Sequence, residues 1–102
     1  MGDLALFISS KAQPGKRDEI YQLYQTIMAP RAEANERQEV VVWCADQHDP
    51  DGFHLFEVYT DAEAFGANAQ SEFFQEFMQA SGPMLAGEPT VAMCSPRWSK
   101  GL

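Results

Sequence analysis

One stretch constrains the fold of this chain more than any other, namely Phe53 to Met78, FHLFEVYTDAEAFGANAQSEFFQEFM. It begins with residues typical of a strand. Thr60-Asp61-Ala62-Glu63 then has the pattern of a capping box, with Thr60 as the N-cap of a short helix. Ser71 is a second N-cap candidate, for a helix with an aromatic face. Gly82 suits a left-handed cap at its end. The stretch therefore predicts a strand and two successive helices.

Three further strands and one helix are predicted elsewhere. After the Pro14-Gly15 turn, apolar residues recur at helical spacing until Pro30, which ends or kinks the helix. This apolar stripe consists of Ile20, Leu23, Tyr24, Ile27 and Met28. Glu39 to Asp46 is apolar on both alternating faces, so both must be covered. The other strands are Leu4 to Ser10 and Pro89 to Ser95.

The resulting order is β-α-β-β-α-β, the ferredoxin-like arrangement of the α+β class. Helices cover only one face of such a sheet. Because the Glu39 to Asp46 strand offers apolar residues to both faces, the open face needs a partner. We predict a homodimer whose two sheets pack into one barrel, a dimeric α+β barrel.

Length and charge limit the remaining choices. With 102 residues, the chain is expected to form one domain, residues 1–102, ending in a tail, Pro96 to Leu102. The formal net charge of −8 argues against nucleic acid and anionic membranes as partners. No apolar run is long enough for a membrane span, and the start lacks a signal-peptide pattern, so we expect a cytoplasmic protein. Cys44 and Cys94 have no metal or redox spacing, which favours buried free thiols.

Two residues of the third strand are candidates for proton transfer. Glu57 lies among apolar neighbours. It is either a base with a raised pKa or a structural carboxylate. His54 points to the opposite face of the strand, as a base or as a structural residue. Apolar side chains form either a binding pocket or only a packed core: Trp43, Tyr59, Phe65, Phe73, Phe74, Phe77 and Met78. Asn68, Tyr59 and Ser9 are the polar groups expected in such a pocket.

Several short motifs point to one family. They are Pro14-Gly15-Lys16, Asp49-Pro50-Asp51, Phe53-x-Leu55-x-Glu57-x-Tyr59, Asp61-x-x-Ala64 and Ser71-x-x-Phe74. With the order of elements, they resemble the antibiotic biosynthesis monooxygenase family of dimeric α+β barrels. The resemblance runs from about residue 4 to residue 95.

This resemblance implies a monooxygenase that uses no metal, flavin or haem. Its substrate would be a small electron-rich aromatic, such as a hydroquinone or a polyketide phenol, whose anion passes an electron to O₂. Asn68 and Tyr59 would then form hydrogen bonds to the substrate, and Trp43 and Phe74 would be walls of its pocket. His54 or Glu57 would accept the proton.

The chain departs from the family pattern at two positions. Asn68 and Phe73 stand where the family often has histidines. A haem-degrading subgroup has Trp and His where this chain has Asn68 and Met78, so haem degradation is not expected. Two alternatives therefore remain open: a non-catalytic dimeric module that binds a small ligand, and an isomerase or cyclase that needs no O₂. The tail residue Trp98 is expected to cross onto the partner subunit.

Overall fold

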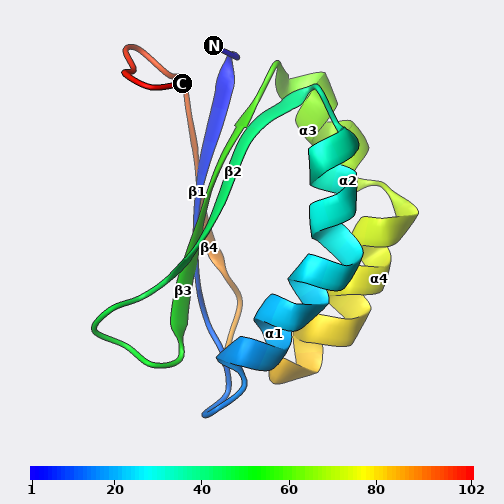
Figure 1. The fold of residues 1–102 in the computed structure, drawn as a ribbon, viewed down its shortest axis with the longest axis vertical. Coiled ribbons are helices and arrows are strands. Elements are labelled where there is room, and N and C mark those ends of the chain that lie inside the picture. The colour runs from blue at the N-terminus through cyan, green and yellow to red at the C-terminus, as the bar shows by residue number, and fades with distance from the viewer.

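A four-stranded antiparallel sheet carries all the helices on one face (Figure 1). The computed structural model describes residues 1–102. Its elements are β1 (Leu4–Lys11), α1 (Arg17–Leu23), the π-helical segment η1 (Tyr24–Met28), α2 (Ala29–Ala34), β2 (Gln38–Ala45), β3 (Gly52–Tyr59), α3 (Ala62–Ala69), α4 (Glu72–Ser81), the 3₁₀ turn η2 (Gly82–Met84) and β4 (Thr90–Cys94). The strand order β2-β3-β1-β4 confirms the predicted ferredoxin-like fold.

The first helical region continues past Pro30. The turn from Tyr24 to Met28 is π-helical, and Pro30 lies in the first turn of α2, which runs on to Ala34. Proline is tolerated in a first turn because no intrahelical partner is needed there for its missing N–H. Pro30 was expected to end or kink the helix, and the first of these alternatives is therefore wrong.

A single arginine ties this helical region to the β2–β3 hairpin. Arg17 Nη1 donates to the carbonyl oxygens of Asp46, Asp49 and Gly52, at 3.3, 3.0 and 3.1 Å. Charged donors make the stronger hydrogen bonds in proteins. The start of α1 is thereby fixed over one end of the sheet.

Two predicted helix ends differ in the structure. Asp61, not Thr60, caps α3, since its carboxylate accepts from the Ala64 N–H at 2.8 Å. The Thr60 hydroxyl is buried without a hydrogen-bond partner. Gly82 has φ −50°, so α4 passes into a 3₁₀ turn instead of a left-handed cap. Ser71 does cap α4, as predicted, with its hydroxyl 3.3 Å from the Phe74 N–H.

The two faces of the sheet differ in exposure. Leu6, which faces the helices, is 1% exposed, whereas its neighbour Phe7 on the outer face is 52% exposed. Phe7 lies beside Phe56 of β3, with ring centroids 4.9 Å apart. Cys44 is a free thiol, as expected, but it is exposed, so the expectation that it is buried is wrong.

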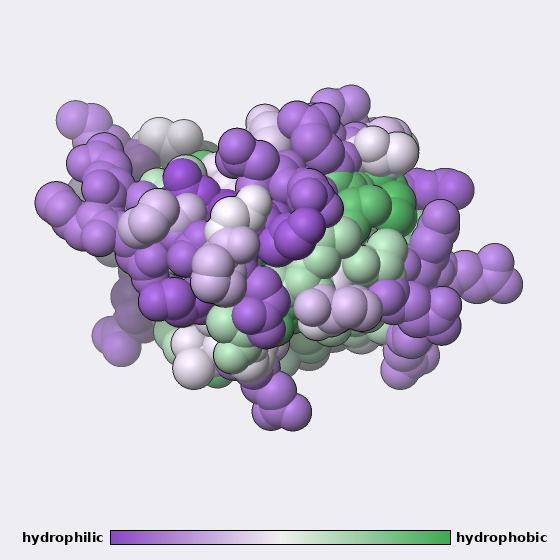
Figure 2. All heavy atoms as spheres, turned by 90° about the horizontal axis from the view of Figure 1, so that it is seen from below, coloured by the Kyte–Doolittle hydropathy of each residue, from purple (hydrophilic) through white to green (hydrophobic).

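The side of the molecule that is seen from below is mostly hydrophilic (Figure 2). On that side, apolar side chains gather in one area framed by hydrophilic ones. No helix is both long and apolar enough to cross a membrane. In the tail, the side chain of Trp98 is 81% exposed.

Candidate functional site

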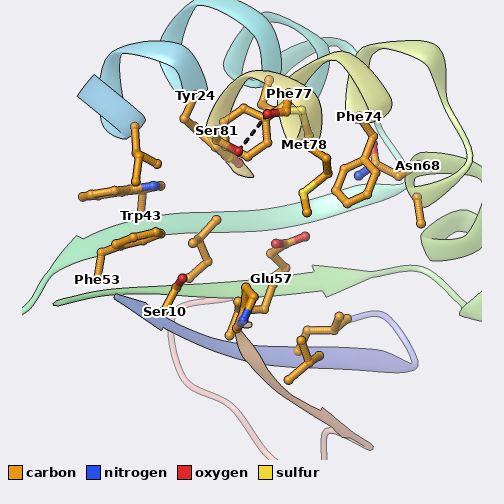
Figure 3. A pocket seen from close by; sticks show the side chains of 18 of the residues that line it. Ser10, Tyr24, Trp43, Phe53, Glu57, Asn68, Phe74, Phe77, Met78 and Ser81 are labelled. Carbon is orange, nitrogen blue, oxygen red and sulfur yellow. Dashed lines mark hydrogen bonds between the residues drawn. The ribbon is translucent and has the colours of Figure 1, made fainter. Parts of the chain in front are cut away.

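A cavity of about 340 Å³ lies between the sheet and the helices (Figure 3). This volume is at the lower end of the range for small-molecule sites, and most of the lining residues are hydrophobic. The lining includes eight of the residues expected from the sequence: Trp43, Glu57, Tyr59, Phe65, Asn68, Phe74, Phe77 and Met78. His54, Phe73 and Ser9 were also expected and do not line it.

Glu57 lies at the centre of a buried polar network. Its Oε1 atom accepts from the Tyr59 hydroxyl at 2.6 Å and from Gln38 Nε2 at 3.0 Å. Both hydrogen bonds reach the same oxygen, which leaves Oε2 without a protein partner. In Figure 3 the carboxylate projects from the sheet toward the helices. One carboxylate oxygen is thus available to a ligand.

Burial changes the acidity of this carboxyl group. Glu57 is only 8% exposed, and removal from water raises its pKa above the ordinary glutamate value. The hydrogen bonds from Tyr59 and Gln38 act in the opposite direction but are the smaller effect. A carboxylate with a raised pKa is a stronger base than an exposed one, which suits proton removal near neutral pH.

The Tyr59 hydroxyl has no free hydrogen-bonding capacity. It donates to Glu57 and accepts from Gln38 Nε2 at 3.2 Å and from Asn68 Nδ2 at 3.1 Å. Burial raises its pKa, and the neighbouring charge of Glu57 adds to the shift. Tyr59 is therefore a neutral group that holds Glu57 in place.

Aromatic rings form much of the cavity wall. The Trp43 indole stacks on Phe53, with centroids 4.9 Å apart and planes 8° from parallel. Phe65 meets Tyr59 edge to face at 5.5 Å. Phe73 does not line the cavity and lies under the Arg31 guanidinium, 5.3 Å from its ring centroid. The wall is thus an apolar, largely aromatic surface.

Two fully buried polar atoms in the cavity lining lack partners. Ser10 Oγ and Trp43 Nε1 are buried without a hydrogen bond. Figure 3 shows both residues near Phe53, toward the opposite end of the cavity from Asn68. The sequence had suggested Ser9 instead, but alternation along β1 points Ser9 to the outer face.

His54 belongs to a separate polar group on that outer face. Its Nδ1 lies 2.9 Å from Ser9 Oγ and its Nε2 lies 2.8 Å from Asp46 Oδ2. The contact with His54 is the main reason why the pKa of Asp46 is lowered. Because side chains alternate along β3, His54 cannot reach a ligand that contacts Glu57.

The family model for antibiotic biosynthesis monooxygenases matches residues 4–80. The chain belongs to this family. Asn68, one of the two positions where the resemblance implied a histidine, donates to Tyr59 in the cavity wall. The other, Phe73, lies outside the cavity. No curated protein sequence matches the chain.

Three solved structures share the fold, and the first two below are named as putative antibiotic biosynthesis monooxygenases. One from Caulobacter crescentus has a TM-score of 0.87 and 21% identity, covering 95% of this chain and 92% of that one. One from Chloroflexus aurantiacus has a TM-score of 0.82 and 20% identity, covering 96% of each chain. A protein from Pseudomonas aeruginosa has a TM-score of 0.83 and 19% identity, covering 96% and 97%.

Among the lining residues that the sequence did not single out, Tyr24 and Gln38 bear on Glu57. Tyr24 appeared only as part of an apolar helical stripe, yet it lines the cavity. Gln38 comes just before the strand that was predicted from Glu39. Its side-chain amide nevertheless donates hydrogen bonds to both Glu57 and Tyr59. The only sequence signal for a site role of either residue is a Gln or Tyr at the boundary of a helix or strand, and this signal is weak.

Proposed function

We propose that this protein is a cofactor-independent monooxygenase acting on a small electron-rich aromatic, a hydroquinone or polyketide phenol, with Glu57 as the proton acceptor. Family membership supports the reaction class. The observation that carries the residue assignment is the buried Glu57 carboxylate, which has a raised pKa and an unpaired Oε2 in an aromatic cavity.

The chemistry asks little of the protein beyond orientation and proton removal. Glu57 takes a phenolic proton, and the electron-rich phenolate reduces O₂. For a simple hydroquinone, one oxygen atom enters the ring and the other leaves as water, giving a hydroxyquinone. The substrate supplies all the electrons, so no external reductant is needed. A dry apolar wall favours this step because it strengthens the electrostatic interactions within the site.

An oxygen electrode tests the proposal directly. Wild-type protein with a panel of hydroquinones should consume O₂ faster than buffer with the same compounds. A Met93→Lys control, altered at a side chain that is 57% exposed, should match the wild type. Consumption at the buffer rate across the whole panel would remove the oxygenase assignment.

A second candidate is a module that binds a ligand without turnover. The replacement of family histidines by Asn68 and Phe73 favours it. In that case hydroquinones would raise the melting temperature without oxygen uptake. An isomerase or cyclase using Glu57 as a base would instead change its substrate under nitrogen.

We also propose that two copies pair through the outer faces of their sheets. Phe7 and Val42, which are 52% and 46% exposed, present apolar surface there. A self-complementary pairing would cover this surface on both copies at once. Sedimentation should show a dimer that Phe7→Lys dissociates and Met93→Lys does not; a wild-type monomer at micromolar concentration contradicts it. Deleting Pro96 to Leu102 should weaken the dimer if Trp98 crosses onto the partner.

A further inference from the structure

Tyr24 is a largely buried residue whose hydroxyl makes no hydrogen bond to another protein group. The residue is 7% exposed and lines the cavity. Burial is the main reason why its pKa is raised, followed by the charge of Glu57, and no hydrogen bond contributes. Unlike Ser10 Oγ and Trp43 Nε1, the Tyr24 hydroxyl is not fully buried, so it is free to donate to a molecule in the cavity.

The backbone at Tyr24 is also unusual. Tyr24 begins the five-residue π-helical segment that ends at Met28. Such turns are rare and occur frequently at functional sites. The Tyr24 ring is held edge to face against Phe77, with centroids 5.8 Å apart and planes at 89°. Its hydroxyl is thus held by a packed ring on a defined helical turn.

The polar groups around it leave Tyr24 as an available donor. The Tyr59 hydroxyl already gives its proton to Glu57. Asn68 Nδ2 and Gln38 Nε2 both donate within the same network. Figure 3 shows Tyr24 on the helical side of the cavity and Glu57 on the sheet side. A ligand between them would meet an acceptor, Oε2 of Glu57, and a donor, the Tyr24 hydroxyl.

We propose that Tyr24 donates a hydrogen bond to the oxygen of the bound phenol and holds it as a phenolate after Glu57 takes the proton. This rests on the proposed function, because it assigns Tyr24 to the same substrate oxygen. The proton moves from the phenol to the Glu57 carboxylate, and the Tyr24 O–H keeps its own. A donor aimed at the oxygen that becomes charged favours the anion over the neutral phenol.

Binding under nitrogen tests this without any turnover. The probe is 4-nitrophenol, whose phenolate absorbs visible light, and the comparison is its methyl ether 4-nitroanisole, which cannot ionise. Tyr24→Phe should weaken binding of 4-nitrophenol about tenfold or more, as expected for a hydrogen bond to a charged group. The bound probe should shift toward the neutral spectrum. Binding of 4-nitroanisole, whose oxygen stays neutral, should weaken much less.

Tyr21→Phe is the matched control. It removes the same atom from a hydroxyl that instead bonds Gln25 at 3.0 Å, and it should alter neither probe. Tyr24→Phe should melt at or above the wild-type temperature, because its hydroxyl has no protein partner to lose.

Three results would overturn the proposal. They are equal affinity and spectrum for wild type and Tyr24→Phe, an equal loss for both probes, and no binding of 4-nitrophenol to the wild type. The oxygen-uptake assay is separate: failure there with the Tyr24 effect intact removes the oxygenase and keeps Tyr24 as a ligand donor. Oxygen uptake that does not change in Tyr24→Phe removes only the role of Tyr24.

Discussion

The Tyr59 hydroxyl donates a 2.6 Å hydrogen bond to Oε1 of Glu57, which lies two residues earlier on the same face of β3. This contact joins the candidate base to a tyrosine that also accepts from Gln38 and Asn68. The four side chains come from β2, β3 and α3. The network therefore fixes the base and links the sheet to the helix above it.

Removing the Tyr59 hydroxyl should destabilise the protein. Tyr59→Phe removes a donor to Glu57 and an acceptor for two amide groups, so we expect a loss of about 2 kcal/mol in the free energy of unfolding. Tyr21→Phe, the same change at an exposed hydroxyl, should cost less than about 0.5 kcal/mol. Urea unfolding measures both. Equal small losses would mean that the network contributes little.

Stability should depend on pH through Glu57. Its pKa is raised in the folded protein, so the unfolded chain loses this proton first as pH rises. The contribution of Glu57 to folding stability is therefore highest at low pH and falls between its unfolded and folded pKa values. Glu57→Gln lacks this penalty, and its stability relative to wild type should grow as pH rises above the ordinary glutamate pKa.

Comparing the two proteins at each pH cancels the groups that they share. Asp46, Asp49 and Asp61 have lowered pKa values, which makes stability rise with pH in both. A difference between wild type and Glu57→Gln that does not change with pH would contradict a raised pKa for Glu57.

The cap of α3 offers a local test. Asp61→Ala removes the acceptor for the Ala64 N–H and should lower the melting temperature. Thr60→Val replaces a buried, unpartnered hydroxyl by a methyl group and should be neutral or stabilising. Thermal melting with matched urea curves compares them. A larger loss of stability for Thr60→Val than for Asp61→Ala would show that Thr60 is the N-cap of α3.

Local patterns in the sequence were sufficient for the fold and for much of the cavity. The period of the helical stripe and the strand alternation gave the elements, and the aromatic residues near Glu57 marked the wall. Asp61 and Thr60 were exchanged as caps because the motif allows either. Gln38 was missed because its bonds span 19 and 21 residues and depend on strand register, including the irregularity between Gln38 and Val40. Tyr24 was missed because the helical spacing already explains it as a core residue. That spacing says nothing about whether its hydroxyl has a partner.

The most direct test of the central claim compares oxygen uptake by Glu57→Gln and His54→Gln with that of wild type. The substrate for this comparison is the hydroquinone of the panel with which the wild type consumes O₂ fastest. Glu57→Gln should lower the rate by about a hundredfold or more, since it removes the proton acceptor while keeping the shape of the side chain. His54→Gln should keep the rate, because His54 faces away from the cavity. A Glu57→Gln protein as fast as wild type, or a comparable loss for His54→Gln, would contradict the account.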